Sequence, residues 1–404
     1  ALMPKRLPPT RLCPPAPAPR FSIAGPHPVN SSITGGSTSR MLPLRPCGIS
    51  KISPGPPSKT ILFSPIRALR NLPALSCSVP PPDSPSAPIA GLVDRLRQGD
   101  PRALARALSL VENDAPEAPA LLSACFPHSG KSLRIGITGA PGAGKSTLVD
   151  RLARAFREQT KTVGVLAVDP TSPFTGGALL GDRIRVAGLH DDSGFYFRSM
   201  ATRGSLGGLA LATADCALLL EASGKEVVLI ETVGVGQDEV EIARLADITL
   251  VVLVPGMGDD VQSLKAGVME IADIYVINKS DRDGAHRVEQ EIRSLQSLAT
   301  KPEDRTPPIV RTVATTGEGI DALSSAISDM QQWLQQDKRL TQRRAQHWQR
   351  RLDAMLRAEL MRRARSNGFD ASVLQFHAAR IASGQQDPWQ LGAQLTEKVF
   401  SNPT

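Results

Sequence analysis

The chain has 404 residues, of which 47 are Lys or Arg, 39 are Asp or Glu and only 5 are Cys. With 41% hydrophobic and 21% charged residues, its composition is ordinary for a globular protein. No apolar run approaches the roughly 20 residues that a membrane-spanning helix needs, and the scattered cysteines form no C-x-x-C pair. These counts exclude a transmembrane helix, and they argue against a disulfide scaffold or a cysteine zinc site. We expect no membrane partner.

The first part of the chain differs from the rest in charge and in proline content. Residues 1–82 contain ten Lys or Arg and no acid, and residues 1–88 hold 21 of the 34 prolines. The excess of positive charge belongs to this segment, so it gives no reason to expect a nucleic-acid partner for the body. We interpret residues 1–88 as a disordered, Pro/Ser-rich basic tail. As a transit segment it would direct the protein to the mitochondrial matrix; as a dispensable tail or a wrong start it would leave the protein cytoplasmic.

In chain order, a helical pattern over residues 89–130 is followed by short apolar runs separated by helical stretches. Predicted strands cover residues 133–138, 163–168, 227–230, 248–254, 274–277 and 309–313. Continuous apolar strands that alternate with helices indicate an α/β fold with a mainly parallel sheet covered by helices. This pattern predicts a domain over residues 131–322. A helical region follows over residues 323–404, with an apolar stripe at i+4 spacing: Trp348, Leu352, Leu356 and Leu360.

Residues 139–146 read GAPGAGKS and match the phosphate-loop pattern G-x-x-x-x-G-K-[ST]. They follow a predicted strand and precede a helix predicted to begin near Thr147. Glycines let successive N–H groups converge on phosphate oxygens. Lys145 would reach the β- and γ-phosphates, and Ser146 would ligate Mg²⁺. The predicted nucleotide contacts of this loop are Gly139, Ala140, Pro141, Gly142, Ala143, Gly144, Lys145, Ser146 and Thr147.

The sequence NKSD at residues 278–281 directly follows the predicted strand at 274–277. The Asp281 carboxylate can accept two hydrogen bonds, from guanine N1–H and from the exocyclic amine, whereas adenine presents a lone pair at the first position. Asn278 can contact the other edge of the purine, and the stem of Lys279 can pack on the ring. Downstream of a phosphate loop, this pattern predicts GTP rather than ATP as the ligand.

Acidic residues at strand ends predict a magnesium site. Glu231 follows the strand at 227–230 in the pattern [DE]-x-x-G, and the N–H of Gly234 can reach the γ-phosphate. Asp169 ends an earlier strand, and Asp182 lies in a Gly-rich loop. Carboxylates that converge on phosphates are unfavourable without a cation, so we expect Mg²⁺ to be held by Ser146, Asp169, Asp182 and Glu231. The alternative for Asp182 is a turn residue.

Several longer motifs resemble one family of P-loop GTPases. They are DPTSPFTGG at 169–177, LGDR at 180–183, TRGSLGG at 202–208, ETVGVGQ at 231–237 and PGMGDDVQ at 255–262. They are similar to those of the MeaB and methylmalonic aciduria type A protein family, the GTPase chaperones of adenosylcobalamin-dependent methylmalonyl-CoA mutase. The resemblance runs from about residue 90 to 395. It implies a homodimeric, Mg²⁺-dependent GTPase, slow without its partner, that gates cobalamin delivery and protects the mutase. Adenosylcobalamin would be bound only through the mutase.

The resemblance also implies roles for individual residues. Lys265 falls in a third switch that responds to the docked mutase; the alternative is an exposed helix lysine. Val313, Ala314 and Thr315 take the place of the last guanine-contacting loop, where the family usually has Ser-Ala. The helices of residues 323–404 would form the dimer contact. The catalytic cluster that the resemblance implies is Lys145, Asp169, Asp182, Glu231 and Lys265.

Three alternatives remain open. A metallochaperone GTPase for another enzyme is disfavoured, because the six His residues are isolated and no C-x-C-C element occurs. A transport-linked nucleotide-dependent kinase needs an acceptor pocket with a base near the γ-phosphate, and no sequence element indicates one. A non-catalytic GTP-dependent scaffold is the third. No Gln stands directly after Gly234 to orient water, so slow intrinsic turnover is expected and could resemble a scaffold.

Overall fold

The computed structural model describes residues 87–169, 188–189, 191–201, 208–232, 245–256, 271–298, 305–366, 369 and 371–401. At residues 169, 201, 208–210 and 398–401 it describes the backbone alone. The predicted tail therefore lies outside the described residues, except for its last two positions. Among the helices that the structure describes, none is long and apolar enough to cross a membrane.

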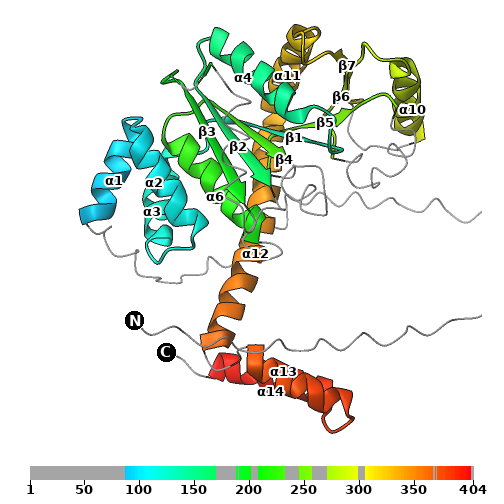
Figure 1. Ribbon diagram of the computed structural model, residues 1–404. Helices are drawn as coiled ribbons and strands as arrows, with labels where there is room; N and C mark the ends of the chain where they lie inside the picture. Colours follow the sequence, from blue (N-terminus) through cyan, green and yellow to red (C-terminus); the bar gives the residue numbers. More distant parts are fainter. Residues whose placement is uncertain are drawn as a thin grey trace, which may run out of the picture. The chain divides into compact units, whose positions relative to one another are not determined.

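A seven-stranded sheet forms the centre of the described region, with the strand order β3-β2-β4-β1-β5-β6-β7 (Figure 1). The six strand pairings are all parallel, so the predicted mainly parallel α/β fold is confirmed. The strands are β1 Leu133–Gly139, β2 Val163–Asp169, β3 Phe195–Ala201, β4 Val227–Thr232, β5 Ile248–Leu253, β6 Ile274–Asn278 and β7 Ile309–Thr312.

Helices cover both faces of this sheet (Figure 1). Alternate side chains of a strand point to opposite faces, so Leu229 of β4 packs in the core beneath α4 and α11, whereas Ile230 packs in the core beneath α6 and the N-terminal helices. A third cluster packs α10 on β5 and β6. The helices around the sheet are α1 Ala87–Arg97, α2 Pro101–Glu112, α3 Ala118–Cys125, α4 Lys145–Glu158, α6 Gly208–Ala222, α10 Ala285–Leu298 and α11 Ile320–Gln335.

The edge strand β3 is the one described strand that the sequence did not predict. Its sequence FYFRSMA contains Arg198 and Ser199 and lacks a continuous aliphatic run. It pairs only with β2, so it does not need the Val/Ile/Leu run of a central strand. Arg198 is held instead by two side-chain hydrogen bonds to Glu112 of α2.

The chain continues through the 3₁₀ turn η3 Gln336–Lys338 into the long helix α12 Arg339–Ser366, followed by α13 Ala371–Ala382 and α14 Pro388–Ser401. Two adjacent arginines fasten α12 to the amino-terminal edge of the sheet. Arg343 binds both carboxylate oxygens of Asp273, at 2.8 and 2.9 Å. Arg344 binds both oxygens of the buried Asp247, at 2.8 and 2.6 Å. The two acids directly precede β6 and β5, so the helix is clamped to the starts of neighbouring strands.

The apolar stripe predicted on this helix is packed only in part among the described residues: the ring of Trp348 meets that of Phe126 edge to face. Leu352 is 58% exposed and Leu356 is 59% exposed, and no residue of α12 is buried. The sequence analysis predicted this stripe from its i+4 spacing alone. Within one chain, the stripe is therefore exposed at Leu352 and Leu356 and half-buried at Trp348 and Leu360.

We predict that Arg344→Ala lowers the free energy of unfolding by about 3 kcal/mol, because it leaves the buried Asp247 carboxylate without its cation. The matched control is Arg350→Ala on the same helix, where the side chain is exposed; a surface substitution of this kind is expected to stay within about 0.5 kcal/mol. Urea unfolding of both variants measures the difference. Equal midpoints for the two variants would show that the clamp contributes nothing to stability.

Candidate functional site

The phosphate loop leaves β1 at Gly139 and enters α4 at Lys145. The helix begins two residues before the predicted Thr147, so Lys145 and Ser146 lie in its first turn, where backbone N–H groups have no partner within the helix. Gly139, Gly142 and Gly144 have φ values of 140°, 75° and 86°. A Cβ on Gly139 would lie 2.1 Å from the carbonyl oxygen of Val252 on β5. The loop therefore needs glycine for its backbone conformation and for its close approach to β5.

Lys145 lies folded over this loop. Its Nζ donates hydrogen bonds to the carbonyl oxygens of Gly139, at 2.7 Å, and Ala140, at 2.9 Å. The side chain is only 5% exposed. A buried ammonium group at the start of a helix gives the loop a concentrated positive charge, and this is the arrangement that binds phosphate groups.

Ser146 and Glu231 meet at the carboxyl-terminal edge of the sheet. The Ser146 Oγ donates a hydrogen bond of 2.5 Å to Oε1 of Glu231. Glu231 is 9% exposed and lies near the end of β4, paired with Ile137 of β1. Parallel pairing of β1 with β4 therefore brings a hydroxyl and a carboxylate from residues 85 positions apart into contact. These hard oxygen donors suit Mg²⁺, which uses one or two protein ligands together with phosphate oxygens and water.

A second polar pair joins the ends of the same two strands. The Thr232 Oγ1 donates a hydrogen bond of 3.2 Å to Oγ1 of Thr138, and both threonines are buried. The sequence analysis did not select either residue. A threonine near the end of an apolar strand gives no chemical signal until the sheet order is known.

Asn278 connects the phosphate loop to the guanine side of the site. Its Nδ2 donates to the carbonyl oxygen of Ala143 at 2.8 Å. Its Oδ1 accepts from Ala314 N at 3.1 Å and from Thr312 Oγ1 at 3.2 Å. A Cβ on Gly144 would lie 2.4 Å from this Nδ2. The buried amide thus fixes three chain segments, and glycine at 144 leaves room for it.

Lys279 and Asp281 follow Asn278 on the surface of the site. Lys279 adopts a φ of 55°, which is uncommon for a residue with a side chain, and its Nζ donates to the carbonyl oxygen of Gly142 at 2.8 Å. Its stem therefore extends back across the phosphate loop. Asp281 is exposed, and its carboxylate accepts no hydrogen bond from another described residue. Its acceptor oxygens are available for the two donors of a guanine base.

The loop at residues 313–315 is held from two sides. Ala314 donates to Asn278, and Arg151 of α4 donates to the carbonyl oxygens of Ala314, at 3.0 Å, and Thr315, at 2.5 Å. The N–H of Val313 is bonded to the carbonyl oxygen of Glu318 at 2.9 Å, so this group serves the turn itself. Arg151 was not predicted, because its partners lie more than 160 positions away.

Part of the predicted site lies outside the described residues: Asp182, Gly234, Lys265 and the side chain of Asp169. Backbone geometry places Asp169 at the end of β2, beside β4 in the sheet. Among the described side chains, no group of three or more His, Cys, Asp or Glu could hold a metal ion by itself. The roles assigned to the site residues therefore stay predictions, while the structure brings Lys145, Ser146, Glu231 and Asn278 to one edge of the sheet.

The sequence pattern of the methylmalonyl Co-A mutase-associated GTPase MeaB matches residues 104–368. The chain belongs to the MeaB family. It is 43% identical to a putative GTPase of Pyrococcus horikoshii, over 77% of this chain and 98% of that protein. It is 39% identical to the mitochondrial methylmalonic aciduria type A homolog of Mus musculus, over 54% of this chain and 55% of that protein.

The fold of this MeaB-family chain is similar to a crystal structure described as an LAO/AO transport system kinase. The TM-score is 0.61 at 30% identity, and the match covers 77% of this chain and 97% of the other. Family membership and the relatives named as GTPases make this chain a GTP-hydrolysing protein that binds GTP and GDP.

We predict that Gly144→Ala weakens GDP binding about tenfold or more, because its Cβ would displace the Asn278 amide and the buried groups bonded to it. The matched control is Gly142→Ala in the same loop, which has a φ of 75° and no atom within 4 Å of the added Cβ. Both variants carry the strain of a positive φ, of order 1 kcal/mol. Calorimetric titration with GDP separates strain from displacement, and equal affinities in the two variants would contradict the role of Asn278.

Proposed function

We propose that this MeaB-family GTPase is a chaperone of an adenosylcobalamin-dependent methylmalonyl-CoA mutase, gating cobalamin delivery and protecting the enzyme. The observation that supports GTP binding and hydrolysis is the group of side chains around the phosphate loop, at the carboxyl-terminal edge of the sheet. There Lys145, the Ser146–Glu231 pair and Asn278 surround the phosphate loop. The mutase as partner is supported by the family's description as mutase-associated and by the similarity to the methylmalonic aciduria type A homolog.

The proposed chemistry follows from the groups that the site holds. Lys145 would neutralise phosphate charge. Asp281 would accept hydrogen bonds from the guanine base, and Asn278 would hold the loops around it. Ser146 and Glu231, with Asp169 and Asp182, would hold Mg²⁺. When bound, Mg²⁺ supplies neutralisation of charge on the β- and γ-phosphate oxygens. Gly234 and Lys265 would belong to segments that respond to the γ-phosphate and to the mutase.

Slow hydrolysis without a partner is part of this proposal. The residues that follow Gly234 are Val235 and Gly236, and neither can orient a water molecule through a side-chain amide. Partner proteins often complete such sites, so a docked mutase is expected to accelerate the reaction. The coupling must be reciprocal: if the mutase favours one nucleotide state, that state favours mutase binding by the same free energy.

A kinase function is the alternative that one comparison favours, because a structure of similar fold is described as a transport system kinase. The two functions differ in the fate of the γ-phosphate. A GTPase releases inorganic phosphate, whereas a kinase transfers the group to an acceptor. Measurement of phosphate release together with acceptor labelling therefore separates them.

We predict that methylmalonyl-CoA mutase accelerates single-turnover GTP hydrolysis about tenfold or more, and that Lys265→Ala removes most of this acceleration while changing the basal rate little. Lys338→Ala, an exposed lysine in η3, serves as the control. All phosphate is expected as inorganic phosphate. Absence of stimulation in the wild type would contradict the chaperone proposal, and unchanged stimulation in Lys265→Ala would remove that residue from the mechanism.

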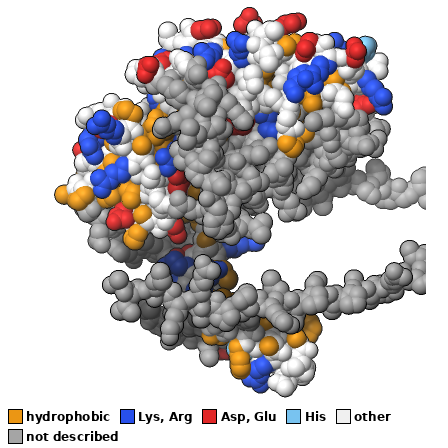
Figure 2. Space-filling model, in the orientation of Figure 1, with side chains coloured by type: hydrophobic (Ala, Val, Ile, Leu, Met, Phe, Trp, Pro, Cys, Tyr) orange, Lys and Arg blue, Asp and Glu red, His pale blue; other side chains and the backbone are white. Residues whose placement is uncertain are grey.

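The exposed apolar side chains of the C-terminal helices support the proposal of a homodimer. Besides Leu352 and Leu356 on α12, Phe376 of α13 is 59% exposed and Trp389 of α14 is 83% exposed. Hydrophobic side chains gather at the surface over α13 and α14 (Figure 2). Large apolar side chains grouped on a surface mark interaction sites. The one-turn spacing of Leu352 and Leu356 presents a narrow apolar seam of the kind that two helices share.

We predict that the double substitution Leu352→Glu with Leu356→Glu converts the dimer to a monomer, because it would bury two carboxylates in an apolar contact. Sedimentation equilibrium measures the mass. Basal GTP hydrolysis is expected to persist, since the site is built from one chain. A dimer in the double variant would place the contact elsewhere.

A further inference from the structure

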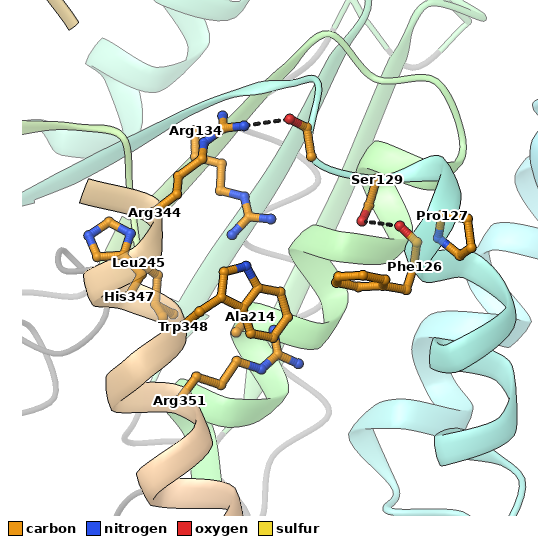
Figure 3. Close-up of a pocket in the computed structure, with 11 residues that line it drawn as sticks. Phe126, Pro127, Ser129, Arg134, Ala214, Leu245, Arg344, His347, Trp348 and Arg351 are labelled. Carbon is orange, nitrogen blue, oxygen red and sulfur yellow. Dashed lines mark hydrogen bonds between the residues drawn. The ribbon is translucent and has the colours of Figure 1, made fainter. Parts of the chain in front are cut away.

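A cavity of about 310 Å³ lies at the amino-terminal edge of the sheet, between the 3₁₀ turn η2 Phe126–His128, α6 and α12 (Figure 3). The residues that matter for its chemistry are Phe126, Arg134, Leu245, Trp348 and Arg351. Arg134 is the second residue of β1, whereas the phosphate loop follows the last residue of the same strand. The cavity is therefore separate from the nucleotide site.

One wall of the cavity is aromatic. The rings of Phe126 and Trp348 meet edge to face, with centroids 5.5 Å apart and planes at 79°. Phe126 is 52% exposed, so much of its ring remains open to a ligand. Leu245 and Pro127 extend this apolar surface. Such a wall suits a flat apolar group, because aromatic side chains bind other rings through offset or edge-to-face contacts.

The polar groups in the cavity that lack a hydrogen-bond partner are N–H donors of two arginines. Arg134 pairs with Glu221 through Nε, and its two terminal nitrogens have no acceptor among the described residues. Figure 3 shows this guanidinium directed into the cavity. Arg351 pairs with Asp215 through Nη2, and its buried Nε has no hydrogen-bond partner in the described structure. The Arg351 Nε is thus a buried donor without an acceptor, which is uncommon in folded proteins, and together with the terminal nitrogens of Arg134 it favours a ligand that brings oxygen acceptors.

The neighbouring acceptors and the nearby histidine also favour a ligand that brings oxygen acceptors. The carbonyl oxygens of Gly130 and Ser132 at the rim are already bonded to Arg344. Burial lowers the pKa of His347 to about 4; Asp247 opposes this effect, and the positive charges of Arg343, Arg350 and Arg134 add to it. The imidazole is therefore neutral at pH 7 and does not compete as a cation. Each of the three lining arginines has one carboxylate partner, so the attraction for a ligand rests on their remaining N–H donors and not on a net charge.

We propose that this cavity binds a small aromatic carboxylate, with the carboxylate on Arg134 and Arg351 and the ring against Phe126 and Trp348. The planar fork of arginine matches the two oxygens of a carboxylate. The volume lies at the lower end of the roughly 300–1,000 Å³ of small-molecule sites, as expected for a small ligand. Because the walls come from η2, β1 and α12, an occupant would fasten α12 to the body of the chain.

The test uses the full chain saturated with GDP and the probe 4-fluorophenylacetate, followed by ¹⁹F NMR titration. We expect saturable binding at one site that persists in excess GDP. The neutral analogue 4-fluorophenylacetamide is expected to bind at least about tenfold more weakly than the carboxylate, because it cannot form the charged pair with arginine. This comparison needs no variant, so it holds even if a substitution prevents folding.

Two variants locate the site. Arg134→Lys keeps a cation opposite Glu221 but removes the forked donors, and Trp348→Leu removes one side of the aromatic wall. Each substitution is expected to lower the affinity for the probe about tenfold. Arg350→Lys, on the exposed side of α12, is the matched control and is expected to bind as the wild type does. Failure of the wild type to bind the probe saturably, or binding that is equal in Arg134→Lys and the control, would overturn the proposal.

Discussion

One buried amide holds the nucleotide site together. The Asn278 side chain donates to the phosphate loop through Ala143 and accepts from Ala314 and Thr312. Each of these groups would cost about 1–3 kcal/mol if it were buried without a partner. The phosphate-binding loop and the loop after β7 are therefore joined directly through one side chain, with Arg151 of α4 as a second link, and Gly144 lacks a Cβ where the Asn278 side chain passes. Lys145, and Ser146 with its hydrogen bond to Glu231, follow directly on the loop that this amide holds.

The sheet links this site to the C-terminal helices. Strands β1, β5 and β6 lie side by side, and the phosphate loop and Asn278 stand at their carboxyl ends. At the amino ends of β5 and β6, Asp247 and Asp273 bind Arg344 and Arg343 of α12. The same acids also accept backbone N–H groups of Arg134 and Thr249. The clamp is thus part of the sheet's own hydrogen bonding, and α12 is joined to the strands that carry the nucleotide site.

The sequence could predict those features that are local in the chain. The phosphate loop, the strand before it and the NKSD turn are short patterns with a chemical reason for each residue, and most central strands were predicted within one or two residues of their ends. The edge strand β3 was not predicted, because Arg198 interrupts its apolar pattern. Arg151, Thr138 and the Arg344–Asp247 pair could not be found, since their partners are far away in sequence and meet only after the sheet order is set. The stripe on α12 was visible as a pattern, but a pattern does not show what covers it.

Calorimetric titration of GDP into Asn278→Ala, beside the wild type, tests the central role of this amide most directly. We predict that GDP affinity falls about tenfold to a hundredfold, because the carbonyl of Ala143 and the N–H of Ala314 lose their common partner. Binding of inorganic pyrophosphate is expected to fall as well, since the amide positions the phosphate loop and does not act only on the base. Wild-type affinity for GDP in Asn278→Ala would contradict this role.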